Sequence, residues 1–201
     1  YPGIPIISEE TKQLPYHVRK NWARLWLVDP LDGTKEFIKR NGEFTVNIAL
    51  IEDGAPVLGV VYVPAQNVTY VGVKNLGSFK SAKGTEGFTK IENHVSYLSK
   101  QNVVIVASRS HLTDDTLNFV ERLKAKGKQV NFISSGSSLK FCLVAEGKAD
   151  VYPRFGPTME WDTGAAHAVA LFAGRQVLEY PTGKPLQYNK ENLLNPFFIV
   201  E

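Results

Sequence analysis

The spacing of apolar residues divides the chain into two halves with different predicted structures. In the first half, short apolar runs bounded by turn residues predict strands over 4–7, 24–28, 44–51, 56–63 and 68–73, with a short helix over 34–39. Asp53-Gly54 is a hairpin turn signal between two of these strands. The segment 78–89 is rich in Gly, Ser, Lys and Thr, which predicts a mobile loop or a sheet edge. We therefore expect a β-rich first half.

After residue 100 the predicted strands alternate with helices. The continuous apolar run 103–107 is typical of a strand buried on both faces. The remaining patterns predict helices over 114–126, 137–146 and 163–172, and strands over 130–133, 149–152 and 197–200. This alternation indicates an α/β layer. We expect residues 1–100 and 101–201 to form two halves of one closely packed unit.

Composition narrows the class of protein only modestly. The chain has 201 residues, 43% hydrophobic and 21% charged, as in soluble globular proteins. Its net charge of +3 is too small to indicate a nucleic-acid polymer as partner, and no apolar run approaches the roughly 20 residues of a membrane span. The single cysteine, Cys142, excludes an internal disulfide and fits a reducing cytoplasm. Because the chain opens Tyr1-Pro2-Gly3 without an initiator Met, we interpret it as part of a longer protein.

The first candidate site is a turn with two carboxylates three residues apart, Asp29 and Asp32. Pro30 keeps Asp29 extended, Gly33 permits a close turn, and Asp32 or Thr34 can cap the helix that follows. Two hard oxygen ligands beside the N–H groups of a helix start are suited to Mg²⁺ and a phosphate together. An ordinary capped turn between strand and helix is the alternative interpretation.

Two further acidic positions have equally simple alternatives. Glu9 and Glu10 follow the first predicted strand, where adjacent carboxylates commonly lie on a solvated face. Asp162 precedes a helix that contains Gly164-Ala165-Ala166. It is either a simple N-cap or a metal ligand on a helix whose small residues allow a close approach.

Polar residues of the second half suggest an anion site. His111 follows the buried strand 103–107, at the end where open α/β sheets bind ligands. Lys140 lies in the first turn of a predicted helix, where a cation opposes the helix dipole unless an anion lies between them. Arg154 can add a bidentate phosphate contact. For His111 or Arg154 taken singly, a solvated surface residue is the alternative.

In order and content, these motifs resemble the inositol monophosphatase superfamily of Mg²⁺-dependent, lithium-sensitive phosphatases. The resemblance is carried by residues 26–51, which include Asp29-Pro30-Leu31-Asp32-Gly33-Thr34, and extends over nearly the whole chain. Within the superfamily, segments 35–45, 108–111, 136–147 and 152–158 resemble the bacterial bisphosphate nucleotidases. The implied fold is α/β, with layers in the order αβαβα. Members begin with two helices and a loop bearing a further aspartate, which we do not find before Tyr1.

The resemblance also implies a metal site. Glu9 matches a ligand that orients water, Asp29 a carboxylate that bridges two ions, and Thr34 a hydroxyl that positions the attacking water. The remaining implied ligands are the Leu31 carbonyl oxygen, Asp32 and Asp162. Two or three Mg²⁺ ions are implied. In one departure, Gly164-Ala165-Ala166 stands where the family usually has Ala-Ala-Gly, so small residues are kept.

The implied substrate site contains the residues of the nucleotidase branch that hold a nucleoside monophosphate. These are His111, Ser137, Lys140 and Arg154. Glu9, Leu31, Asp32, Gly33, Thr34 and Asp162 are expected to lie around the phosphate that is hydrolysed. Residues 1–100 would thus form a metal-binding half and residues 101–201 a substrate-binding half.

The implied activity is Mg²⁺-dependent hydrolysis of the 3′-phosphate of 3′-phosphoadenosine 5′-phosphate to AMP and phosphate, in sulfur assimilation. The expected partner is this small nucleotide, and the expected location is the cytoplasm, with peripheral association at the inner membrane left open. One alternative is an inositol or sugar monophosphatase with the same metal site. Another is a catalytically inactive phosphate-binding fragment or scaffold. Lys140 and Arg154 favour the nucleotidase, because a second phosphate requires additional cations.

Overall fold

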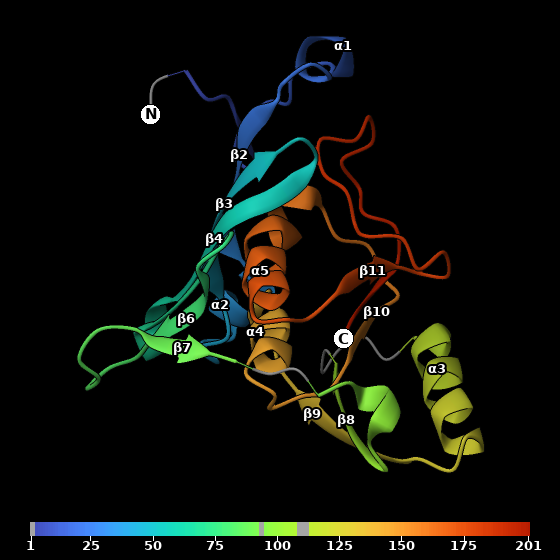
Figure 1. Cartoon of the computed structure of the whole chain (residues 1–201). Helices are drawn as coiled ribbons and strands as arrows, with labels where there is room; N and C mark the ends of the chain where they lie inside the picture. The colour runs from blue at the N-terminus through green and yellow to red at the C-terminus, as the bar shows by residue number, and fades with distance from the viewer. Residues whose placement is uncertain (1–2, 93–94, 108–112) are drawn as a thin grey trace.

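A large, mainly antiparallel sheet forms one side of the molecule (Figure 1). The structure is a computed structural model that describes residues 3–92, 95–107 and 113–201. Only the first two strands of the large sheet pair in parallel. Its strands follow one another in chain order: β1 (Ile6–Ser8), β2 (Arg24–Asp32), β3 (Thr45–Glu52), β4 (Ala55–Val63), β5 (Val68–Val73), β6 (Gly77–Ser81) and β7 (Thr89–Ile91).

The second half builds a smaller strand layer. β8 (Asn102–Ala107) pairs in parallel with β9 (Gln129–Ser134), and β12 (Phe198–Val200) lies between β10 (Tyr152–Arg154) and β11 (Val177–Glu179). A parallel bridge between Ile105 and Val151 joins these two groups of strands.

The longer helices lie between and outside the two strand layers (Figure 1). α4 (Leu139–Ala145) and α5 (Glu160–Phe172) occupy the middle, and α3 (Asp114–Ala125) packs on the outer side of the second layer. The short helical segments are α1 (Tyr16–Arg19), α2 (Thr34–Ile38), η1 (Pro64–Gln66) and η2 (Tyr97–Ser99). This layered arrangement confirms the α/β fold class expected from the sequence.

Glycines of the large sheet allow α5 to lie unusually close to it. A Cβ atom on Gly59 of β4 would stand 2.2 Å from the carbonyl oxygen of Ala165, and one on Gly72 of β5 would stand 2.5 Å from that of Ala168. On the helix side, a Cβ on Gly164 would come within 2.9 Å of Leu27. The predicted close approach of this helix is therefore confirmed, and its partner is the sheet.

Two details of capping differ from prediction. α5 begins at Glu160 instead of residue 163, so Asp162 lies in the first turn, and its carboxylate accepts a hydrogen bond from the Met159 N–H at 2.8 Å. Asp162 is therefore not the N-cap residue. α2 is preceded by Gly33 in a left-handed conformation (φ 88°), and neither Asp32 nor Thr34 makes a side-chain cap there. The carboxylate of Asp32 instead accepts hydrogen bonds from the turn before α4.

Three further features of the described residues relate to the sequence analysis. Cys142 is fully buried in α4. The segment predicted as a mobile loop or a sheet edge contains most of β6, which pairs with β5 and β7, and the first residue of the edge strand β7. None of the helices in the described part of the chain has both the length and the hydrophobicity that crossing a membrane requires.

Candidate metal and phosphate site

The parallel pairing of β1 and β2 brings the first two acidic residues together. Ser8 is in register with Val28, so Glu9, which directly follows β1, and Asp29, the next residue of β2, lie at the same end of the sheet. The first turn of α5 supplies Asp162 from the other side. One carboxylate oxygen from each of these three residues lies within 4.8 Å of the other two. Three acids from distant parts of the sequence thus converge on one point.

Asp29 is the buried member of this cluster, with 1% of its surface exposed. Its Oδ1 accepts a hydrogen bond from the Leu31 N–H at 2.9 Å, while its buried Oδ2 has no hydrogen-bond donor among the described residues. Burial, with the nearby negative charge of Asp32, raises the pKa of Asp29 to about 8. A buried carboxylate oxygen without a donor is a suitable ligand for a cation.

The pKa of Asp162 is raised for the same reasons as that of Asp29. Burial and the charge of Asp32 raise its pKa to about 7, although the Met159 N–H acts in the opposite direction. A divalent cation between these carboxylates would favour their charged forms. The donor set therefore fits Mg²⁺, which prefers hard oxygen ligands.

A local irregularity of the sheet sets the position of Asp32. Asp29 opposes Asn47, whereas Asp32 opposes Thr45, so β2 contains one residue more than β3 over this stretch. This bulge redirects the backbone between the two aspartates. Oδ2 of Asp32 accepts hydrogen bonds from the Ser137 hydroxyl and from the Ser138 N–H, the latter at 2.7 Å. Asp32 lies outside the three-acid cluster itself.

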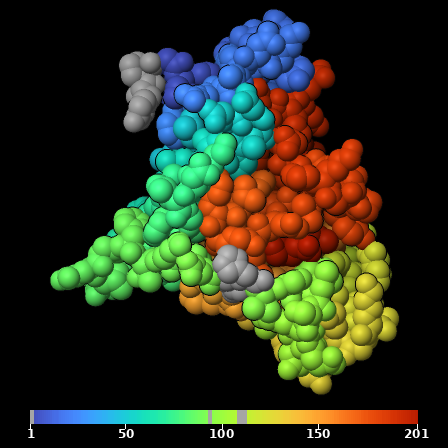
Figure 2. Space-filling view, in the orientation of Figure 1, coloured from blue at the N-terminus to red at the C-terminus, as the bar shows by residue number. Residues whose placement is uncertain are grey.

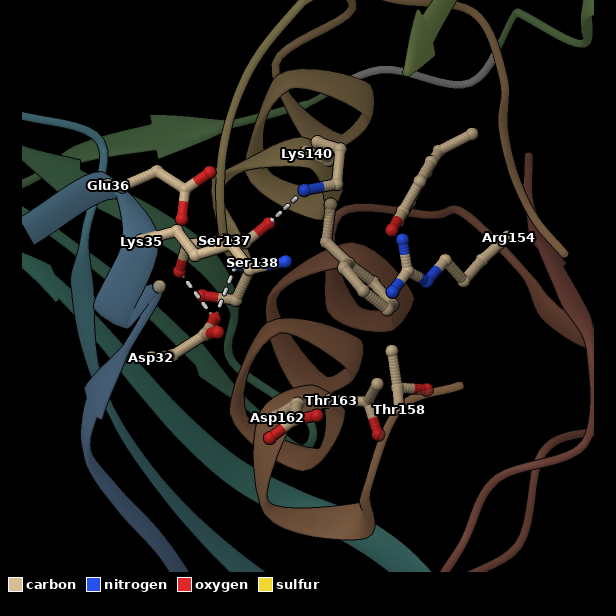
Figure 3. A pocket seen from close by; sticks show the side chains of 13 residues that line it. Asp32, Lys35, Glu36, Ser137, Ser138, Lys140, Arg154, Thr158, Asp162 and Thr163 are labelled. Carbon is tan, nitrogen blue, oxygen red and sulfur yellow. Dashed lines mark hydrogen bonds between the residues drawn. The ribbon is translucent and has the colours of Figure 1, made fainter. Parts of the chain in front are cut away.

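A pocket beside these acids contains two of the predicted cations, Lys140 and Arg154 (Figure 3). Lys140 is 4% exposed, and its Nζ donates to the carbonyl oxygens of Ser137 at 2.6 Å and Ser135 at 3.4 Å. Burial lowers the pKa of Lys140 to about 8.

Arg154 faces the same pocket from β10 (Figure 3). It donates from Nη2 to the Pro157 carbonyl at 2.9 Å, and its buried Nε has no acceptor in the described part of the chain. The remaining pocket residues are Asp32, Gly33, Lys35, Glu36, Ser137, Ser138, Phe141, Tyr152, Thr158, Asp162 and Thr163.

Most of the site residues predicted from the sequence fall in this region. Asp32, Gly33, Ser137, Lys140, Arg154 and Asp162 line the pocket, and Glu9 and Asp29 belong to the acidic cluster with Asp162. Leu31 lies in the bulge between the two aspartates, and Thr34 is exposed at the start of α2. The roles predicted for the Leu31 carbonyl oxygen and the Thr34 hydroxyl stay predictions. His111 lies outside the described residues.

Sequence reasoning missed the polar residues behind Asp32. Thr45 and Asn47 are fully buried, and Asn47 donates to Asp32 Oδ2 at 3.3 Å. The available signal was the alternation in β3, where these two polar residues share a face with Ala49. Since that face packs against the interior, polar residues on it indicate a buried hydrogen-bond network.

The sequence analysis also did not predict the hydrogen bonds that hold the first turn of α5. The fully buried Glu160 accepts hydrogen bonds from the backbone N–H groups of Asn189 and Lys190 and from the Lys190 ammonium. Asn195 donates to Thr163 at 3.0 Å. The C-terminal segment that contains Asn189, Lys190 and Asn195 is red in Figure 2 and lies against α5. At the top of the view it also lies beside the N-terminal residues around α1. It anchors the turn of helix that carries Asp162.

Comparisons with known proteins identify the family of this chain. Residues 1–196 match the model of the inositol monophosphatase family. The chain is 50% identical to the 3′(2′),5′-bisphosphate nucleotidase CysQ of Salmonella typhimurium, covering 99% of this chain and 76% of that protein. The enzyme of the same name from Escherichia coli is 48% identical over the same shares.

Among solved structures, the fold is similar to that of CysQ from Bacteroides thetaiotaomicron, described as a bacterial member of the inositol monophosphatase family. The TM-score is 0.89 at 51% identity, covering 99% of this chain and 77% of that one. The match to the family model, the identity to its members and this shared fold lead to one conclusion. The chain belongs to the inositol monophosphatase family.

Proposed function

We propose that this protein is a Mg²⁺-dependent 3′(2′),5′-bisphosphate nucleotidase that removes the 3′-phosphate of 3′-phosphoadenosine 5′-phosphate to give AMP and phosphate. The observation that carries the proposal is the presence of a three-acid cluster and two cations, Lys140 and Arg154, around one pocket. The names of relatives about 50% identical to this chain support the same activity.

The acidic residues would hold the metal. Glu9, Asp29 and Asp162 would bind Mg²⁺, with Asp32 and the Leu31 carbonyl oxygen completing a site for two or three ions. When bound, Mg²⁺ lowers the pKa of a coordinated water and neutralises charge on the phosphoryl oxygens. Glu9 and Thr34 would orient the attacking water, so that positioning contributes much of the rate acceleration.

The two cations would select the substrate. Lys140 holds a buried ammonium at the pocket wall, and Arg154 presents a guanidinium whose Nε lacks an acceptor among the described residues. A nucleotide with a second phosphate supplies the anion that both groups would bind. An inositol monophosphate carries only the phosphate that is hydrolysed, so this pair of cations favours the nucleotide.

The two halves of the chain would divide these tasks. Residues 1–100 contribute Glu9, Asp29 and Asp32, and residues 101–201 contribute Lys140 and Arg154 together with one acid, Asp162. We also propose a cytoplasmic role in sulfur assimilation, in which this nucleotide would be the small-molecule partner.

Phosphate release tests the proposal directly. With Mg²⁺ present, we expect the purified protein to release phosphate from 3′-phosphoadenosine 5′-phosphate with a kcat/KM at least about 10-fold above that for inositol 1-phosphate. Omission of Mg²⁺ should abolish both reactions. Equal or better hydrolysis of inositol 1-phosphate would instead identify a monophosphatase with the same metal site.

A further inference from the structure

Two pockets adjoin each other beside the acidic cluster. The pocket described above, here the first pocket, shares three lining residues with a second pocket: Lys35, Tyr152 and Arg154. Apart from these three, the described residues that line the second pocket are alanine, threonine, proline, phenylalanine and glycine. Lys35 therefore lies at the boundary between the two pockets.

The two pockets differ in charge. Three acids, Asp32, Glu36 and Asp162, line the first pocket, whereas the described residues that line the second pocket include no carboxylate. Among those residues, the charged side chains are the two shared cations, Lys35 and Arg154. A cavity lined by charges of one sign attracts groups of the opposite sign. A metal ion is thus favoured at the acidic side of the first pocket, and a second anionic group is favoured at the boundary.

Lys35 offers free hydrogen-bond donors at this boundary. Its side chain is exposed, and its ammonium makes no hydrogen bond or ion pair with another described residue. By contrast, the Lys140 ammonium donates to two carbonyl oxygens, and Nη2 of Arg154 donates to the Pro157 carbonyl oxygen. Since an ammonium group has three N–H donors, Lys35 can direct all of them to a ligand.

Lys35 and Arg154 come from distant parts of the fold. Lys35 lies in α2, directly after Thr34, and Arg154 lies in β10. Figure 3 shows these two residues on opposite sides of the first pocket. A phosphate between them would contact a rotatable ammonium on one side and a planar guanidinium on the other. Hydrogen bonds of this kind, between charged partners, are stronger than those between neutral groups.

We propose that Lys35 is a specificity-determining residue that binds the second, non-hydrolysed phosphate of the nucleotide together with Arg154. The inference rests on the proposed function for the identity of that nucleotide. Because the ammonium of Lys35 touches a group that does not react, it contributes to substrate binding and not to the chemical step.

Binding of AMP, which keeps the second phosphate, tests the inference without turnover. With isothermal titration calorimetry on the full 201-residue protein without metal, we expect Lys35→Met to weaken AMP binding about 10-fold, because one charged hydrogen bond to phosphate is lost. The affinity for adenosine, which has no phosphate, should stay within about twofold of wild type. Lys35→Arg keeps the positive charge, so its AMP affinity should stay within about threefold of wild type.

A matched control comes from the end of the same helix. Lys39 directly follows α2 and is exposed, but it lines neither pocket. Lys39→Met removes the same charge, and its AMP affinity should stay within about twofold of wild type. An unchanged AMP affinity in Lys35→Met would overturn the proposal, as would an equal loss of affinity in Lys39→Met.

Turnover separates this inference from the proposed function. With Mg²⁺ and 3′-phosphoadenosine 5′-phosphate, Lys35→Met should raise KM about 10-fold while kcat changes little, and an unchanged KM would contradict the role of Lys35. Absence of phosphate release in wild type would refute the proposed function. A loss of AMP affinity in Lys35→Met but not in Lys39→Met would still support the role of Lys35 in binding the second phosphate.

Discussion

Replacing Gly59 with alanine should separate α5 from the large sheet and disturb the acidic cluster at its N-terminus. The new Cβ would lie 2.2 Å from the Ala165 carbonyl oxygen and 2.7 Å from the Ala168 Cβ. Ordinary contact begins near 3.4 Å, so strand and helix must move apart by about 1 Å. The clash would be between a Cβ atom and a backbone carbonyl oxygen, so a change of side-chain rotamer cannot relieve it. Overpacking of this kind costs about 1–3 kcal/mol.

The consequence for the site follows from helix geometry. Asp162 lies three residues before Ala165 and therefore near the same face of α5, so the displacement is transmitted to its carboxylate. A misplacement of about 1 Å can reduce turnover about 100-fold.

Chemical denaturation and phosphate release measure the two effects of Gly59→Ala. Gly156→Ala is the control for stability, because its Cβ would meet nothing closer than 3.6 Å, and its free energy of unfolding should stay within about 0.5 kcal/mol of wild type. Wild-type stability and activity in Gly59→Ala would refute the close packing as described.

Three further predictions concern single side chains. Asp32→Asn should reduce Mg²⁺-dependent turnover by more than about 100-fold while changing the denaturation midpoint little, and retained activity would contradict its assignment as a ligand. Glu160→Gln should lower the free energy of unfolding by about 3 kcal/mol, because the Lys190 ammonium then loses its buried partner; denaturant titration measures this loss, and an unchanged midpoint would contradict it. Since burial lowers the pKa of Lys140 to about 8, its charge is present below pH 8 and lost above it. The kcat/KM for 3′-phosphoadenosine 5′-phosphate relative to 3′-AMP should therefore fall as the pH rises through 8, and a constant ratio would exclude the lysine.

Local patterns in the sequence predicted much of the fold. The alternation in β3 and β4, the Asp53-Gly54 turn between them and the amphipathic α3 were each recognisable within a few residues. Strand ends were less well predicted, because pairing across the sheet extends β2 through Pro30 as far as Asp32. The start of α5 was missed for a similar reason, since Glu160 begins the helix where the C-terminal segment binds it.

The acidic cluster shows what local patterns cannot supply. The sequence motif indicated Asp29 and Asp32, but the approach of Glu9 depends on the parallel register of β1 with β2. Gly59 and Gly72 have no side chain that would mark them as functional in the sequence. They nevertheless determine how closely α5, which carries Asp162, approaches the large sheet. The contact between Ser137 and Asp32 joins residues far apart in the chain, so no local pattern could predict it.

The central claim is that the acidic cluster and the two cations select a nucleotide with two phosphates. Its most direct test is the ratio of kcat/KM for 3′-phosphoadenosine 5′-phosphate to that for 3′-AMP, measured with Mg²⁺ in wild type and in Lys140→Met. Loss of one charged contact predicts a ratio about 10- to 100-fold lower in the variant, with hydrolysis of 3′-AMP little changed. A ratio that is equal in the two proteins would contradict the claim.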